Sequence, residues 1–124
     1  MARYVDGFLL PVPKKKLGTY RRIAKVAAKV WRQHGALDYV ESVGDDLACP
    51  GHPSFEKRAS CKRGDVAVFS YITYRSRAHR DKVNAKVMAD PRMLKLMQTM
   101  SDPRKTPFDM KRMSYGGFRV LVEA

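Results

Sequence analysis

The hydrophobic pattern of residues 66–74 predicts a strand that carries apolar or aromatic side chains on both of its faces. Successive side chains of a strand point to opposite sides of the sheet. One side therefore carries Val66, Val68, Ile72 and Tyr74, and the other carries Ala67, Phe69 and Tyr71. Since both sides require burial, the sheet needs a cover on each face.

Three further strands are predicted over residues 4–12, 36–43 and 115–123. Pro11 and Pro13 close the first of them, because proline cannot donate to a strand ladder. Gly44 ends the second. The pair Gly116 and Gly117 indicates a bulge or a close backbone approach in the last strand. Residues 45–65 show no sustained period and contain several prolines and glycines, so we expect a long loop.

Two helical segments separate these strands. Between residues 14 and 34, apolar positions recur at the three-and-four spacing of an amphipathic helix, as at Tyr20, Ala24 and Ala27, and Gly35 stops it. Ser76 is a good N-cap for a second helix that ends at Asp90, and Pro91 begins a shorter helix that runs to about residue 100.

The resulting order, β-α-β-β-α-β, predicts an α+β fold of the ferredoxin-like kind. We expect one domain over residues 1–124, with a four-stranded antiparallel sheet that carries its helices on one face. The opposite face then exposes an aromatic patch. A second copy of the chain would hide that patch and form a dimeric α+β barrel with a cavity between the two sheets.

The formal net charge is +13, which favours partners rich in phosphate. Four basic residues recur at helical spacing on the outer side of the first helix: Arg22, Lys25, Lys29 and Arg32. This basic ridge is either a solvated face or a surface that binds RNA or another nucleic acid. No arginine-rich tail or known nucleic-acid motif accompanies it, so nucleic-acid binding stands as the alternative function.

Several classes of protein are disfavoured by what the sequence lacks. No apolar run is long enough for a membrane helix, and the basic cluster at residues 14–16 follows the first apolar stretch, the reverse of a secretory signal. We therefore expect a cytoplasmic protein in which Cys49 and Cys61 stay reduced, although a disulfide between them is the alternative. These cysteines and His52 match no closed four-ligand zinc pattern, and no cofactor fingerprint is present, so we expect neither metal nor cofactor.

Three stretches carry a family resemblance: residues 4–41 (YVDGFLLPVPKKKLGTYRRIAKVAAKVWRQHGALDYVE), residues 74–93 (YRSRAHRDKVNAKVMADPRM) and residues 107–124 (PFDMKRMSYGGFRVLVEA). Together they resemble the YbaA-like family of small bacterial proteins of unknown function. The resemblance implies a ferredoxin-like dimeric α+β barrel, an architecture shared with cofactor-independent monooxygenases of antibiotic biosynthesis and with muconolactone isomerases. The loop CPGHPSFEKRASCKRGD departs from the family pattern, and fold does not fix function.

Four residues are candidates for acid–base chemistry. His34 and His79 lie on helix faces that we expect to point toward the sheet, where each could serve as a proton acceptor or as a half-buried structural histidine. Asp6 and Glu41 lie within otherwise apolar strands. Each carboxylate either pairs with a cation or faces a ligand as an acid or an orienting partner. For such pairing the candidate cations are Arg80, Lys111, Arg112 and Arg119.

The remaining candidates concern a ligand. Tyr4, Tyr39, Tyr71 and Tyr74 either line a cavity or pack at an interface, and Arg80 or Arg112 could hold an anionic group. A methionine stripe at residues 93, 97 and 100 is assigned to core or dimer packing. The sequence therefore predicts a homodimer that binds a small organic or anionic molecule between its sheets, with cofactor-independent chemistry as an extension.

Overall fold

The computed structural model describes residues 2–124. The elements follow the predicted order, with one additional helical turn in the long loop. They are β1 (Tyr4–Pro13), α1 (Leu17–Gln33), β2 (Asp38–Val43), α2 (Phe55–Arg58), β3 (Asp65–Tyr74), α3 (Arg77–Ala89), α4 (Pro91–Ser101) and β4 (Ser114–Arg119), with single 3-10 turns at Lys14–Lys16 and Met110–Arg112.

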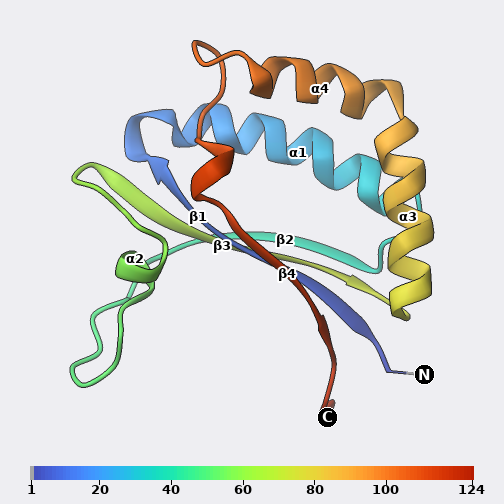
Figure 1. The fold of residues 1–124 in the computed structure, drawn as a ribbon, viewed down its shortest axis with the longest axis horizontal. Helices are drawn as coiled ribbons and strands as arrows, with labels where there is room; N and C mark the ends of the chain where they lie inside the picture. Colours follow the sequence, from blue (N-terminus) through green and yellow to red (C-terminus); the bar gives the residue numbers. More distant parts are fainter. Residues whose placement is uncertain (1) are drawn as a thin grey trace.

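The four strands form one antiparallel sheet in the order β2-β3-β1-β4, which confirms the ferredoxin-like prediction. Helices α1, α3 and α4 all lie on one side of this sheet (Figure 1). Two buried clusters of apolar side chains lie between the helices and the sheet. One gathers around Val30, Tyr74 and Val87, and the other around Leu10, Val12 and Val68.

The strand register determines which polar side chains face the helices. Asp6 of β1 is opposite Ile72 of β3, and Glu41 of β2 is opposite Ser70 of β3. Because Ile72 and Ser70 lie two residues apart on β3, they and their partners share the helix-covered face. Two carboxylates and one hydroxyl are therefore placed within an otherwise apolar face.

Two local features differ from the prediction. β4 ends at Arg119, and its pairing with β1 is continuous from Ser114, so the glycine pair marks a close approach without a bulge. A side chain at Gly117 would collide with the Tyr4 ring. Within the long loop, Ser54 caps α2 by accepting a hydrogen bond from the Lys57 N–H.

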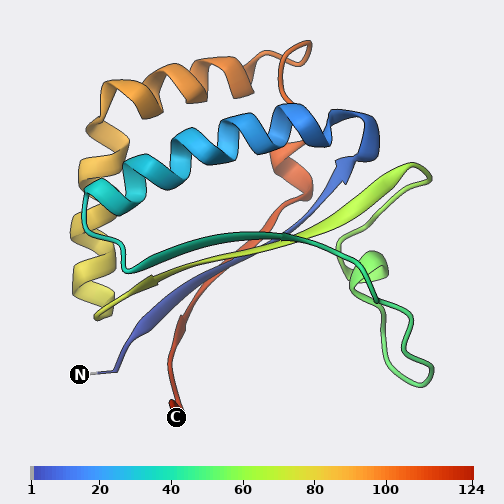
Figure 2. The ribbon, with the colours of Figure 1, turned by 180° about the vertical axis from the view of Figure 1, so that it is seen from behind.

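The opposite face of the sheet is only partly covered. The loop that carries α2 lies on this side at one end (Figure 2), where Phe55 contacts Phe69 edge-on. Ala67 is buried beneath the loop region, whereas Phe69 and Phe118 are 47% and 63% exposed. We call this surface the open face. No helix of the described chain is long and apolar enough to cross a membrane.

Candidate functional site

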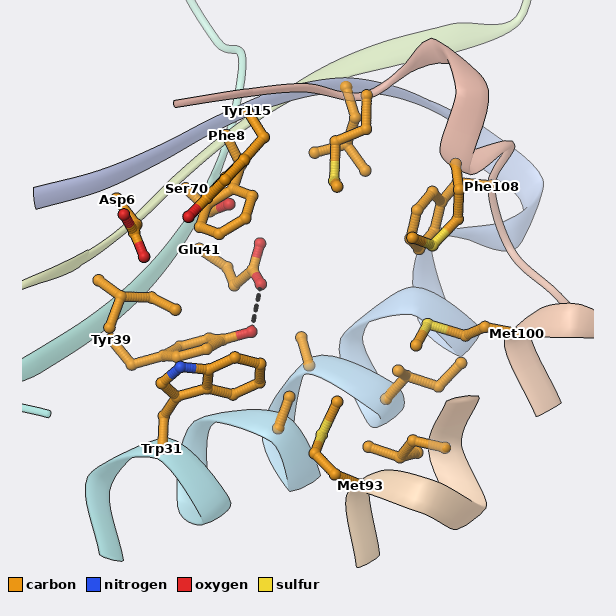
Figure 3. Close-up of a pocket in the computed structure, with 18 of the residues that line it drawn as sticks. Asp6, Phe8, Trp31, Tyr39, Glu41, Ser70, Met93, Met100, Phe108 and Tyr115 are labelled. Carbon is orange, nitrogen blue, oxygen red and sulfur yellow. Dashed lines mark hydrogen bonds between the residues drawn. The ribbon is translucent and has the colours of Figure 1, made fainter. Parts of the chain in front are cut away.

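A cavity of about 410 Å³ lies between the helix-covered face of the sheet and the helices α1 and α4 (Figure 3). The predicted cavity is a different one, on the other face between the sheets of two copies, and it stays a prediction. The lining is mostly apolar and aromatic. Every methionine of residues 2–124 takes part in it: Met88, Met93, Met97, Met100, Met110 and Met113. The predicted methionine stripe is thus a cavity wall, and Met93 is also part of the core.

Four large apolar lining residues are also among the exposed hydrophobic side chains: Met88, Met97, Met110 and Tyr115. They mark where the cavity reaches the surface. Flexible methionine side chains adapt to different shapes without strain. The combination of an apolar, adaptable wall with an exposed apolar rim is typical of a site for a small organic molecule.

Glu41 is held in the cavity by two tyrosine hydroxyls. Tyr20 donates to Oε1 at 2.7 Å and Tyr39 donates to Oε2 at 2.9 Å. Burial, followed by the charge of Glu41, raises the pKa of both hydroxyls far above the ordinary value, so they remain donors. Figure 3 shows the Glu41 carboxylate beside the Tyr39 hydroxyl, with the Trp31 ring next to Tyr39.

Asp6 lies at another part of the wall and has a different environment. Its side chain is buried, and the guanidinium of Arg80 donates to Oδ1 at 2.7 Å. Burial raises the pKa of the Asp6 carboxyl, although Arg80 and hydrogen bonds from Tyr115 and Asn84 oppose that effect. Burial also opposes the charge of Arg80, but hydrogen bonding to Asp81 and attraction by Asp6 raise its pKa overall.

Arg80 is therefore a fixed structural cation. Its Nε donates to Asp81 at 2.8 Å, its Nη1 also donates to the Tyr115 hydroxyl at 3.0 Å, and its guanidinium lies 4.9 Å from the Tyr4 ring centroid. Of the two alternatives left open for Asp6, the structure shows pairing with a cation, and among the four candidate cations that partner is Arg80. The guanidinium does not line the cavity, so the proposed role of Arg80 as an anion holder lacks geometric support.

The two candidate histidines lie outside the cavity. His34 caps the C-terminus of α1, where its Nε2 is 2.8 Å from Oδ2 of Asp90, the N-cap residue of α4. Hydrogen bonds from Arg92 and then His34 lower the pKa of Asp90. Helix α1 ends at Gln33, so the side chain of His34 does not continue the helix face of Trp31. It contacts Asp90 at the α3–α4 junction instead.

His79 occupies the first turn of α3. Its Nδ1 accepts a hydrogen bond from the Arg75 N–H at 3.0 Å, and its ring contacts Tyr74 edge-on. Burial lowers the pKa of the ring, and neighbouring basic residues add to this effect. Both histidines therefore match the structural alternative, and the structure does not bring either one together with Glu41.

The other predicted ligand residues are also dispersed. Arg112 donates to the Ser60 carbonyl and, at 3.1 Å, to Asp65, and neither group lines the cavity. Tyr71 lies on the open face beside Phe69. Tyr4 lies under Arg80, and among the four candidate tyrosines Tyr39 is the one that lines the cavity. A sequence pattern assigns residues to a face but does not show where that face is hollow.

The basic ridge and the cysteine loop are separate from the cavity. Arg22, Lys25 and Lys29 are exposed on α1, while Arg32 donates to the carbonyls of Ala36 and Leu37 and so closes the helix end. Cys49 and Cys61 are both free thiols. Within residues 2–124 no cluster of three metal-ligating side chains occurs.

Sequence reasoning missed several lining residues. Ser70 is a small polar residue between Val68 and Ile72 on an apolar strand face, and in register it lies opposite Phe8 and Glu41. This interruption of the apolar pattern could have predicted a cavity, because a small side chain leaves room above the sheet. Asn84 accepts hydrogen bonds from Trp31 and Tyr74, a role that no helix pattern reveals.

Comparisons with known proteins agree with this fold. A family model described as "Protein of unknown function (DUF1428)" matches residues 3–110. The uncharacterized protein YbaA of Escherichia coli K12 is 38% identical over 121 residues, which is 98% of each chain, and YbaA of Shigella flexneri matches equally well.

Two solved structures share the fold. A Nitrosomonas europaea protein provisionally named an antibiotic biosynthesis monooxygenase has a TM-score of 0.57 and 13% identity, with 97% of this chain and 91% of that chain covered. A point mutant of SnoaB, a cofactor-independent oxygenase from Streptomyces nogalater, has a TM-score of 0.55 and 12% identity, with 99% and 97% covered. At these identities the likeness concerns the fold.

Proposed function

The chain belongs to the DUF1428 family, and we propose that its function is to bind a small, largely apolar organic molecule in the cavity between the sheet and helices α1 and α4. The observation that carries this proposal is the cavity itself. Its volume of about 410 Å³ lies within the range of small-molecule sites, and its apolar wall includes a few polar groups.

The polar groups of the wall would orient the ligand. Glu41 accepts from two tyrosine hydroxyls and retains lone pairs that a ligand could use. Asp6 already forms an ion pair with Arg80. For any cofactor-independent chemistry in this cavity, proton transfer would pass through Glu41, because His34 and His79 lie elsewhere. The name of SnoaB, a cofactor-independent oxygenase with the same fold, is compatible with this extension.

The binding proposal is tested with Trp31, the single tryptophan of the chain, which lines the cavity. We expect 2-phenylethanol to change the fluorescence of Trp31 in a saturable manner. Ser70→Leu adds a large side chain to the cavity wall and should abolish the change. Ser42→Leu makes the same replacement at an exposed position of β2 and should leave it intact. A wild-type protein that gives no saturable signal with any neutral or charged phenyl compound would refute the proposal.

We also propose that a second copy of the chain covers the open face. Support comes from Phe69 of β3 and Phe118 of β4, which are large apolar side chains on the same face of the sheet and are left exposed by the monomer. Light scattering at micromolar concentration should give the mass of a dimer. Tyr71→Asp, on this face, should yield monomers, whereas Leu94→Asp, at an exposed position on α4, should not. A stable wild-type monomer would remove this part of the proposal.

A second candidate function is nucleic-acid binding through the basic ridge. The observation in its favour is that Arg22, Lys25 and Lys29 are exposed and form no ion pair among the described residues. If five phosphates are contacted, log affinity should fall with log salt with a slope of roughly −3.5 to −4.5. Arg22→Glu with Lys29→Glu should abolish that binding. RNA affinity no tighter than a Kd of about 1 μM to 0.1 mM would reduce the ridge to a solvated face.

A further inference from the structure

The cavity has a charge pattern opposite to that of the protein as a whole. The chain carries 25 Lys and Arg against 12 Asp and Glu, yet the described cavity wall contains two carboxylates and no Lys, Arg or His. Arg80 reaches Asp6 from outside the lining and neutralises it. Glu41 has no such partner in residues 2–124, so it is the uncompensated charge of the cavity.

We propose that the ligand of this cavity is a protonated organic amine, with Glu41 as its counter-ion; this inference rests on the proposed binding function. An ionised carboxylate within an apolar wall is costly unless an opposite charge accompanies it. The two tyrosine hydroxyls donate hydrogen bonds to the carboxylate and offset part of that cost, but they bring no positive charge. An ammonium group supplies both the charge and the N–H donors that the carboxylate can still accept.

The aromatic rings beside Glu41 point to the same ligand class. Tyr39 packs against Trp31 with ring centroids 5.8 Å apart, and both rings line the cavity together with Tyr20. The faces of such rings attract cations, and tryptophan does so most strongly. Methionine and aromatic side chains along the rest of the wall would hold the apolar part of the amine.

The same pattern favours the organic over the anionic form of the ligand, which the sequence prediction left open as small organic or anionic. A carboxylate or phosphate ligand would be placed near Glu41 with no free cation in the described lining. Arg80 is bound to Asp6 and Asp81, and Arg112 is bound to Asp65. The high overall positive charge of the chain therefore does not extend into the cavity, and the sign of the local charge selects the ligand.

Three probes of similar size test the inference: 2-phenylethylamine, 2-phenylethanol and phenylacetate, titrated at pH 7 and 0.15 M salt. Trp31 fluorescence and calorimetry provide the readouts. We expect the amine to bind about tenfold more tightly than the alcohol, the effect of a charge-assisted hydrogen bond with a cation–π contact. Phenylacetate should bind more weakly than the alcohol.

Variants then assign the preference to one residue. Glu41→Gln should remove the preference, so that the amine binds no more tightly than the alcohol does to the same variant. Glu56→Gln removes the same charge from an exposed position on α2 and should keep the preference. The comparison among the three probes uses the wild-type protein, so it remains decisive if Glu41→Gln does not fold.

The outcomes separate the two proposals. If the alcohol binds as tightly as the amine, or phenylacetate binds best, the counter-ion inference is overturned while the binding cavity stands. If the amine preference persists in a folded Glu41→Gln protein, Glu41 is not the counter-ion and the inference is likewise overturned. If none of the three probes binds, the binding function itself fails.

Discussion

Asp6 and Glu41 face the same cavity from strands of the same sheet, but the protein supports their charges in opposite ways. Asp6 has a guanidinium at 2.7 Å that is itself fixed by Asp81 and Tyr115. Glu41 has two neutral hydroxyl donors, from Tyr20 and Tyr39. In the Asp6 region the buried carboxylate is neutralised by Arg80, and the pair contributes to the stability of the fold. In the Glu41 region the carboxylate has no cationic partner among residues 2–124. The binding proposal therefore concerns the Glu41 region.

Removing Arg80 should have the largest effect on stability. Arg80→Met leaves the buried Asp6 carboxylate without a cation, so the free energy of unfolding should fall by roughly 3–5 kcal/mol. Urea denaturation at pH 7 measures this change. The double variant Asp6→Asn with Arg80→Met removes both charges and should recover more than half of the loss. A single-variant loss below about 1 kcal/mol would mean that the pair is no tighter than a surface ion pair.

Removing one tyrosine donor should have an intermediate effect. Tyr39→Phe deletes a hydrogen bond to an ionised group and should lower the free energy of unfolding by about 1–2 kcal/mol, with a similar loss for Tyr20→Phe. Tyr71→Phe, on the open face, is the matched control and should change stability little. Equal losses for all three tyrosines, in thermal or urea unfolding, would contradict the idea that Glu41 is held by its hydroxyl donors.

Neutralising Glu41 should change stability least among these substitutions. Glu41→Gln keeps an oxygen that accepts from one tyrosine, and no cation is left unpaired, so we expect a change of about 1 kcal/mol or less. Urea unfolding of this variant beside Arg80→Met compares the two regions directly. A loss as large as that of Arg80→Met would show that Glu41 has a structural role equal to that of the Asp6 pair.

The pH dependence sharpens the same comparison. Burial raises the pKa of the Asp6 carboxyl above its ordinary value of 3.8, so the folded state binds this proton more tightly than the unfolded state. The stabilising contribution of that proton is complete below pH 3.8 and is lost as the pH rises through the folded pKa. The stability of wild type minus that of Asp6→Asn should therefore decrease as the pH rises from 3.8. An increase over this range would mean that Arg80 outweighs burial.

The sequence was sufficient for the architecture because strand and helix periodicities are local. The alternation in residues 66–74 and the spacing of Tyr20, Ala24 and Ala27 each follow from the geometry of one element. The order of elements then left few topologies, and the antiparallel ferredoxin-like sheet is confirmed. The sequence also identified Asp6 and Glu41 as unusual, because a carboxylate in an apolar strand is costly to bury unless it has a hydrogen-bonding or charged partner.

The partners of those carboxylates, and the position of the cavity, were decided by tertiary structure. Arg80 is 74 residues from Asp6, and Tyr20 is 21 residues from Glu41, so no local period relates them. Whether a cavity remains above the sheet depends on how α4 and the segment that follows it pack against α1. That packing is determined by many contacts between residues that are far apart in the sequence. For the same reason His34 and His79 had the expected helix positions yet lay outside the cavity.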